Sequence, residues 1–146
     1  MVYTSKNALP KKGKNEKYCF LAGSIDHNLL GNWRIKVVEE MKNESHFFNP
    51  TRIEHDKFND SQMKKHIEWE LDALELSDKI LLNFLPSAKS PISLVELEIY
   101  VNTSKLLVVC PDQFYQKRYV KTICEKYNTP FFNNLDKAIK YLREEI

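Results

Sequence analysis

The chain has only three glycines among its 146 residues, and this scarcity excludes several nucleotide-binding loops. A dinucleotide site would need a G-x-G-x-x-G series, but the loop after the first predicted strand has the single glycine Gly23. The glycine-rich lysine motif of triphosphate sites is also absent, as is the G-x-S-x-G turn of serine hydrolases. Backbone N–H groups at Gly23 and Ser24 can still bind a hydroxyl or a single phosphate.

Cysteine and histidine are also sparse, and their positions favour neither disulfides nor a metal. The chain has three cysteines, an odd number, and its start lacks the apolar core of a secretory signal. We therefore expect free thiols and a cytoplasmic protein. The four histidines show no metal-ligand spacing, so we predict no metal site.

Charge and hydropathy favour neither a nucleic-acid partner nor a membrane. The chain carries 22 lysines and arginines against 20 acidic residues, a net charge of +2, and has no basic stripe with interleaved aromatic residues. We therefore expect no nucleic acid as partner. No apolar run is long enough to cross a bilayer, so we expect no membrane partner either.

The length and the polar N-terminus predict the domain organisation. A chain of 146 residues suits one domain with a substantial core. Residues 1–17 are polar and rich in lysine and asparagine, which predicts a flexible arm. The folded domain is then expected to span residues 18–146.

Short, continuous apolar runs alternate with helical patterns along this domain. Such runs are typical of strands buried on both faces of a parallel sheet. Strands are expected at residues 18–22, 47–48, 79–85, 105–110 and 129–132. Helices are expected at residues 29–42, 60–77, 91–101 and 113–127 and from 135 onward. The alternation predicts an α/β fold, a three-layer sandwich whose five-stranded parallel sheet has the order 2-1-3-4-5.

One carboxylate lies in an unusually apolar helix. The carboxyl ends of parallel strands form the ligand-binding edge of open α/β sheets, and the helix at 91–101, with Ser90 as its N-cap, begins there. Glu96 lies in its first two turns, where a carboxylate is rarely buried unless it is paired or has a chemical role. The alternative is a capping box, with Ser93 at the helix start and Glu96 bonded back to its backbone.

A second carboxylate, Glu70, falls at the edge of an apolar stripe on the helix at 60–77. The residues of that stripe are Met63, Ile67, Leu71 and Leu74. The alternative is that Glu70 only pairs with His66, four residues earlier, on a solvated flank. Two carboxylates that converge on a pocket suit the cleavage of a glycosidic bond, since one can attack the sugar while the other assists the leaving group.

Five segments together resemble the nucleoside 2-deoxyribosyltransferase family. They are residues 20–25, 33–34, 49–52, 67–71 and 90–97, and the resemblance extends from about Tyr18 to the C-terminus. It implies a flavodoxin-like fold and the exchange of purine or pyrimidine bases on a 2-deoxyribonucleoside, as in nucleoside salvage. The implied route is double displacement through a covalent deoxyribosyl–enzyme, with deoxyribonucleosides and free nucleobases as partners and no cofactor.

The resemblance also implies roles for single residues. Glu96 matches the family's nucleophile, and Glu70 matches an acidic residue that contacts and protonates the leaving base. Ser90 matches a contact to a sugar hydroxyl. The other substrate-binding candidates in the matching segments are Gly23, Ser24, Ile25, Ser93, Asn49 and Trp69. Tyr119 stands where relatives often carry an asparagine that reaches into the neighbouring subunit's site.

The sequence departs from the family pattern at Tyr119 and at Glu98. Glu98 replaces a glycine, and it either raises the pKa of Glu96 or points toward a partner subunit. The first loop contains Asp26 and no arginine, which disfavours a bound phosphate and favours free nucleosides. Arg34 and Arg52 remain as cations for a phosphate.

Two other functions stay open. One is an N-glycosidase that uses water as acceptor, acting on nucleosides or deoxynucleoside monophosphates. The other is a non-catalytic nucleotide-sensing domain, since a fold does not fix a function. The preference for purine or pyrimidine bases is also open.

We also expect a homo-oligomer, a dimer or larger, with the site near the subunit interface. The helix at 91–101 is apolar on nearly every side, which predicts burial on more than one face, and the aromatic pair Phe114 and Tyr115 lies nearby in sequence. Apolar surfaces of this kind need covering, and a symmetric dimer is the commonest arrangement.

Overall fold

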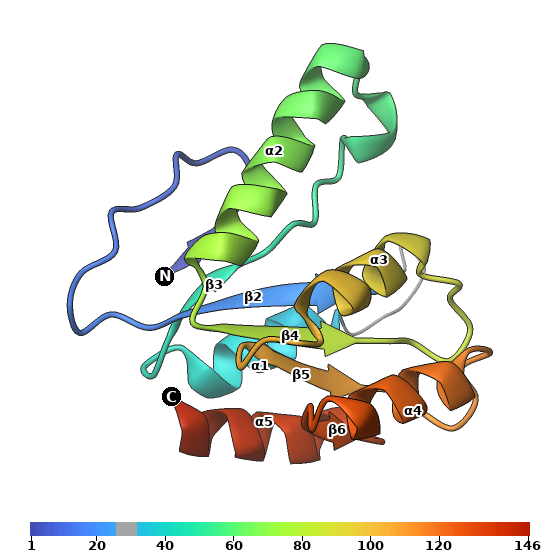
Figure 1. Ribbon diagram of the computed structural model, residues 1–146. Helices are drawn as coiled ribbons and strands as arrows, with labels where there is room; N and C mark the ends of the chain where they lie inside the picture. Colours follow the sequence, from blue (N-terminus) through green and yellow to red (C-terminus); the bar gives the residue numbers. More distant parts are fainter. Residues whose placement is uncertain (26–31) are drawn as a thin grey trace.

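The computed structural model describes residues 1–25 and 32–146 (Figure 1). The described elements, in chain order, are β1 (Val2–Tyr3), β2 (Tyr18–Gly23), α1 (Trp33–Met41), β3 (His46–Phe48), the 3₁₀ turn η1 (His55–Lys57), α2 (Asp60–Leu76), β4 (Lys79–Asn83), α3 (Pro91–Tyr100), β5 (Leu106–Val109), α4 (Lys117–Lys126), β6 (Phe131–Phe132) and α5 (Leu135–Glu145). The expected helix start at residue 29 and the loop residue Asp26 lie outside the described residues.

The strands form one parallel sheet in the order β1-β3-β2-β4-β5-β6. This confirms the prediction of an α/β fold with a parallel sheet. The predicted count of five strands is wrong, and the order 2-1-3-4-5 does not describe the whole sheet, because β1 adds a sixth strand beside β3. A two-residue strand within a polar segment has no apolar run that periodicity could detect.

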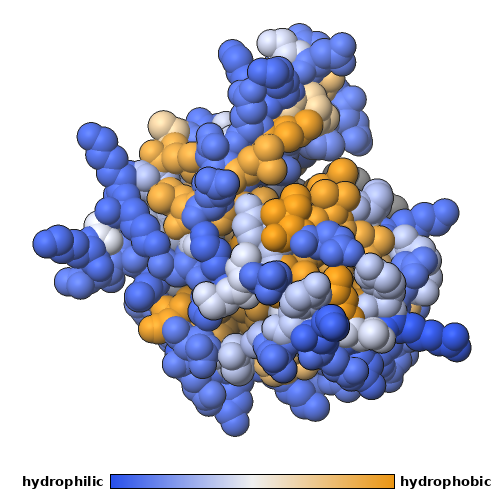
Figure 2. Space-filling view, in the orientation of Figure 1, coloured by the Kyte–Doolittle hydropathy of each residue, from blue (hydrophilic) through white to orange (hydrophobic). Residues whose placement is uncertain are grey.

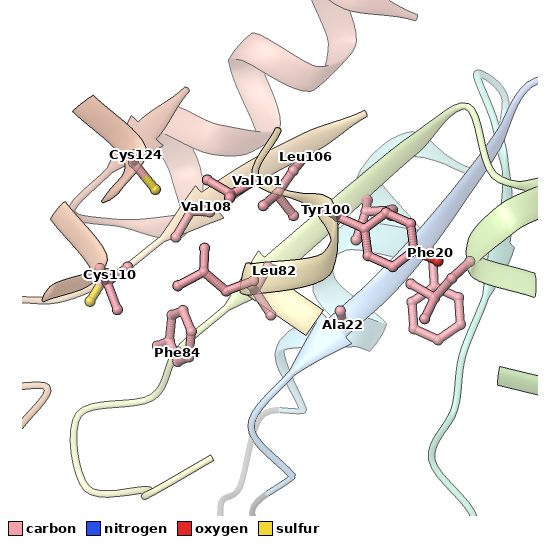
Figure 3. Close-up of a cluster of buried hydrophobic side chains, with 14 of the residues drawn as sticks. Phe20, Ala22, Leu82, Phe84, Tyr100, Val101, Leu106, Val108, Cys110 and Cys124 are labelled. Carbon is pink, nitrogen blue, oxygen red and sulfur yellow. The ribbon is translucent and has the colours of Figure 1, made fainter. Parts of the chain in front are cut away.

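Helices cover both faces of the sheet, α1 and α5 on one and α2, α3 and α4 on the other (Figure 1). Side chains alternate between the faces along each strand. In β4, Ile80 and Leu82 belong to the core cluster under α2, α3 and α4, while Leu81 belongs to the cluster under α1 and α5. Figure 3 shows part of the first cluster, where Phe20 and Leu82 come from two strands and Tyr100 from α3.

The buried face of α2 differs from the predicted one. The residues that α2 buries are His66, Trp69, Ala73 and Leu74. Ile67 and Leu71 were expected to face the core, but they are 45% and 48% exposed. Leu74 is buried as predicted. The prediction is wrong for Ile67 and Leu71, because the indole of Trp69 and the ring of His66 take the inner positions in their place.

α3 is not buried on several faces within the single chain. Leu97 and Tyr100 enter the core, whereas Ile92, Val95 and Ile99 are each more than half exposed. Figure 2 shows the resulting apolar surface over α2 and α3. The prediction of burial on more than one face is therefore wrong for the chain by itself, because only one side of α3 packs on the sheet.

After β1, the N-terminal segment (residues 1–17) passes beside α2 and then curves away in a wide loop before it enters β2 (Figure 1). The indole N–H of Trp69 donates to the carbonyl of Asn7 at 3.1 Å, and the ammonium of Lys12 pairs with Asp78. That this segment is a flexible arm stays a prediction. Across residues 1–25 and 32–146, each helix is too short or too polar to span a bilayer.

Candidate active site

The loop that leaves β2 lies tightly against β4. Gly23 has a φ of 134°, a backbone conformation that side-chain-bearing residues rarely adopt. A Cβ at this position would overlap the backbone of Asn83, its partner in β4. The amide of Ser24 then donates to the carbonyl of Asn83 at 3.0 Å. Only glycine lets the chain turn here without moving away from the sheet.

The buried guanidinium of Arg34 also stabilises this turn. Arg34, in the first turn of α1, is only 2% exposed. Its guanidinium donates to the carbonyls of Leu21 at 3.0 Å, Gly23 at 3.0 Å and Ser24 at 3.2 Å. The indole N–H of Trp33 donates to the same Ser24 carbonyl at 3.3 Å. Arg34 therefore binds the end of β2 and its loop, although the sequence offered it only as a cation for a phosphate.

Ser90 joins this loop to the start of α3. Its hydroxyl bonds to the hydroxyl of Ser24, which also accepts a hydrogen bond from the amide of Leu85 at 2.9 Å. Ser90 precedes α3 as predicted, but its side chain bonds Ser24 rather than capping the helix. Its φ of 53° and ψ of 53° place it in the left-handed region, at a cost of roughly 1–2 kcal/mol. Strain of this kind is concentrated at functional sites.

The capping-box alternative for Glu96 is wrong. α3 begins at Pro91, so Ser93 is the third residue inside the helix and cannot be its N-cap. Glu96 therefore lies in the second turn, too far along the helix to bond the backbone at its start.

Five of the predicted substrate-binding residues line one pocket of about 450 Å³ at the carboxyl ends of β2 and β4. They are Gly23, Ser24, Ile25, Ser90 and Ser93. The same pocket is lined by Ala88, Lys89, Pro91 and Ile92. Its volume falls within the range of small-molecule sites.

α2 and α3 bring Glu70 and Glu96 into one electrostatic site with Arg34. Burial raises the pKa of Glu70 to about 7, against the attraction of Arg34. Burial and the charge of Glu70 raise the pKa of Glu96 to about 7, again opposed by Arg34. Burial lowers the pKa of Arg34 to about 10. This value is still well above neutral pH, so the guanidinium stays charged there. These raised pKa values let either carboxyl group gain or lose a proton near neutral pH.

The predicted pairing of Glu70 with His66 is also present. The His66 Nε2 atom lies 2.9 Å from the Glu70 Oε1 atom. The flank is not solvated, however, because the side chains of His66 and Glu70 are only 3% and 21% exposed. The pairing and the site at Glu70 are therefore compatible, and His66 belongs to the surroundings of the site. The sequence indicated the four-residue spacing of His66 and Glu70, but it did not predict that both side chains are largely buried.

The structure places the other three candidates away from this pocket, in contacts with the protein. The side-chain oxygen of Asn49 accepts a hydrogen bond from the amide of Thr51 at 3.0 Å. Trp69 packs edge-on against Phe48 in the core, with a centroid distance of 6.0 Å. The hydroxyl of Tyr119 donates to a carboxylate oxygen of Glu98 at 2.8 Å, on the exposed surface of α3 and α4.

Glu98 was expected either to raise the pKa of Glu96 or to point toward a partner subunit, and the structure bears on the first of these roles. The neighbouring charge that raises the pKa of Glu96 is that of Glu70, whereas Glu98 accepts the hydrogen bond of Tyr119.

Among the described residues, no group of three His, Cys, Asp or Glu side chains is placed to bind a metal ion. That the protein needs neither metal nor cofactor stays a prediction.

Comparison with known proteins adds a family to this geometry. No curated protein matches the chain. A family model described as nucleoside 2-deoxyribosyltransferase like matches residues 16–114, more than half of the chain. The matched range includes the pocket, Arg34, Glu70 and Glu96, and it leaves out Tyr119 and residues 1–15. The chain therefore belongs to the nucleoside 2-deoxyribosyltransferase-like family.

Proposed function

We propose that the protein transfers a 2-deoxyribosyl group between nucleobases, purine, pyrimidine or both. The observation that carries this proposal is the pair Glu70 and Glu96, two partly buried carboxylates with pKa values of about 7 beside the charged Arg34. Such a pair supplies one ionised and one protonated carboxyl group at neutral pH. Nucleophilic attack with protonation of a leaving base needs one of each.

In the first half of the reaction, the ionised Glu96 attacks C1′ of the deoxyribose. The bond from C1′ to the base nitrogen breaks, the bonding pair leaves with the base, and the protonated Glu70 gives its proton to that base. In the second half, a new base attacks C1′ and the ester bond to Glu96 breaks. The ionised Glu70 takes the proton that the incoming base must lose. Sugars without a 2′-hydroxyl form the cation-like transition state more readily, so two carboxylates can suffice.

The pocket beside α3 is the proposed sugar site. Ser24, Ser90 and Ser93 line it with side-chain hydroxyls, and the hydroxyl bond between Ser24 and Ser90 fixes two of them. Hydroxyl groups in fixed positions can orient the sugar so that C1′ faces Glu96. No cofactor enters this scheme.

One observation favours a second candidate, hydrolysis of deoxynucleoside monophosphates. Lys89 lines the same pocket and is a cation that a 5′-phosphate can pair with. The mechanism would keep Glu96 and Glu70, with water in place of the incoming base. A nucleotide-sensing domain has less support, because it would not need the two carboxylates at a pKa of about 7.

The test is a chromatographic assay of deoxyinosine with free adenine, run beside deoxyinosine alone and deoxynucleoside monophosphates. Deoxyadenosine that forms only when adenine is present supports transfer, whereas release of base without a new nucleoside supports hydrolysis. Glu96→Gln should lower the rate at least about a thousand-fold and Glu70→Gln about a hundred-fold. Glu75→Gln is the matched control, because it removes an exposed carboxylate from α2 and should leave the rate unchanged. Full exchange by Glu96→Gln would overturn the mechanism.

We further propose a cytoplasmic homo-oligomer with its site near the subunit interface. The exposed residues Ile92, Val95 and Ile99 on α3 give an apolar surface that a second copy can cover (Figure 2). The three cysteines are free and buried, which suits a reducing compartment. Sedimentation at micromolar concentration tests the assembly, and a monomeric mass would contradict it.

A further inference from the structure

A line of close polar contacts connects Arg52 to Glu70 through Ser5 and His66. The guanidinium of Arg52 donates to the hydroxyl oxygen of Ser5 at 2.8 Å. The same hydroxyl lies 2.8 Å from the Nδ1 atom of His66, and the other ring nitrogen of His66 lies 2.9 Å from Glu70. Three segments of the chain thus meet at His66: the N-terminal segment, the connection after β3, and α2.

The chemistry of the groups gives this line a direction. An arginine can only donate, so the Ser5 oxygen accepts from Arg52 and keeps its own proton to donate. Its neighbour at that distance is His66 Nδ1, which therefore accepts. A neutral imidazole that accepts at Nδ1 carries its proton on Nε2, the ring atom that lies 2.9 Å from Oε1 of Glu70. Each link then has one donor and one acceptor.

The surroundings keep His66 neutral and hold it in place. Burial lowers the pKa of His66, and electrostatic interactions with His55 and Arg52 lower it further. The rings of His55 and Phe58 pack against it at centroid distances of 5.3 and 5.7 Å. The titratable and charged groups around the line are Lys6, Arg52, Glu54, His55 and Glu70. Glu54 pairs with both Arg52 and Lys6, so the cation of Arg52 is itself fixed.

The hydroxyl in this line comes from a part of the chain outside the family match, which begins at residue 16. The segment around Ser5 is anchored on both sides. Before it, β1 pairs with β3 through Val2 and Tyr3. After it, the carbonyl of Asn7 accepts the indole N–H of Trp69. The N-terminal segment is therefore held on both sides of Ser5, by β3 and by α2, before it loops away toward β2 (Figure 1).

We propose that Ser5 and His66 are positioning residues for Glu70, so that the N-terminal segment of this chain takes part in setting the ionisation of the catalytic acid. The meaning of the proposal for catalysis rests on the proposed function, but the contacts among Arg52, Ser5, His66 and Glu70 do not. A neutral N–H donor favours the ionised carboxylate and opposes the effect of burial. Glu70 must release a proton to one base and take one from the next, so a balance of the two effects near neutral pH serves both halves of the reaction.

The test measures the titration of Glu70 directly, by carbon-13 NMR of labelled glutamate carboxyl groups, with Glu70→Gln to assign the signal. His66→Phe removes the N–H donor and should raise the pKa of Glu70 by about 1, a ten-fold change in proton affinity. His66→Gln keeps an N–H donor at a similar reach and should leave the titration near that of the unmodified protein. An unchanged titration in His66→Phe, or equal shifts in both variants, would overturn the proposal.

Ser5→Ala supplies a second, milder test that leaves α2 intact. Without the Ser5 hydroxyl, His66 loses the donor that fixes its tautomer. Nitrogen-15 NMR of the ring should change from a single Nε2–H form to a mixture, and the pKa of Glu70 should rise. Ser104→Ala, in the exposed turn before β5, is the matched control and should change neither signal. An unchanged ring signal in Ser5→Ala would refute the role of the N-terminal segment.

These readouts separate the two proposals. If the Glu70 titration shifts as expected but the protein exchanges no bases, the positioning role stands and the proposed function fails. If bases are exchanged while the titration stays unchanged in His66→Phe and Ser5→Ala, the proposed function stands and the positioning role fails.

Discussion

Removing the cation that braces the first loop, by Arg34→Met, should affect both stability and ionisation. Three carbonyl oxygens, those of Leu21, Gly23 and Ser24, would lose a charged donor at once. A hydrogen bond to a charged group contributes about 1.5–3 kcal/mol, and an unpaired buried acceptor costs a similar amount. Because the loop can admit some water after the change, we expect the free energy of unfolding to fall by about 4 kcal/mol. For a domain of this size that lowers the Tm by about 12 °C.

The same substitution should raise the pKa of both Glu70 and Glu96 above about 7, because the charge of Arg34 lowers both. At pH 7 too little of Glu96, the proposed nucleophile, would remain ionised, so the rate of base exchange should peak at a higher pH. Arg34→Lys separates the two effects. It keeps the charge, and therefore the pH profile, but a lysine cannot reach three carbonyls in fixed directions, so most of the stability loss should remain.

Urea unfolding and the pH profile of base exchange measure the two effects independently. Arg34→Met as stable as the unmodified protein would refute the idea that the guanidinium braces the loop. An unshifted pH profile in Arg34→Met would refute its electrostatic link to the two carboxylates. An Arg34→Lys protein of full stability would show that charge, rather than the forked geometry of three hydrogen bonds, is what the loop needs.

Gly23→Ala should lower the free energy of unfolding by at least about 2 kcal/mol, since a Cβ would strike the backbone of Asn83 at a backbone angle that favours glycine. Thermal unfolding measures this against Gly13→Ala, whose new Cβ meets only the flexible end of Glu16 and should cost less than about 1 kcal/mol. Glu96→Gln should stabilise the protein at pH 8 by about 2 kcal/mol and leave it unchanged at pH 4. The sign follows from its raised pKa: the folded state binds the proton more tightly, so stability is full below the unfolded pKa of about 4.5 and falls until about pH 7. Equal urea midpoints for both proteins at pH 8 would contradict this.

The central part of the fold could be predicted because its physical signal is strong. The apolar run from Lys79 became β4, since a strand covered on both faces must be apolar throughout. β1 could not be found, because Val2 and Tyr3 are ordered by pairing with β3 and not by a pattern of their own. The phase of α2 was missed because His66 counts as polar in a hydropathy pattern, although a hydrogen bond to Nδ1 and a carboxylate beside Nε2 let it be buried.

The candidate site was predictable only in part, for a related reason. The loop at Gly23 and Ser24 followed from the topology, which places the ends of parallel strands at one edge. The role of Arg34 depends on three carbonyls whose directions the backbone sets only after folding, and a cation beside a tryptophan carries no signal for that role. The contact of Tyr119 could not be predicted either, since nothing in the sequence indicated that its hydroxyl donates to Glu98.

The two edges of the sheet have a consequence for self-association. β1 covers β3 with only two residues, and the opposite edge, β6, also has two residues and directly follows Pro130. Short edges with a proline nearby offer few unpaired N–H and C=O groups to the strand of another molecule, which protects a sheet protein from aggregation and fibril growth. The proposed homo-oligomer would therefore form through helical surfaces, where contact adds no strand and the assembly can close instead of growing without limit.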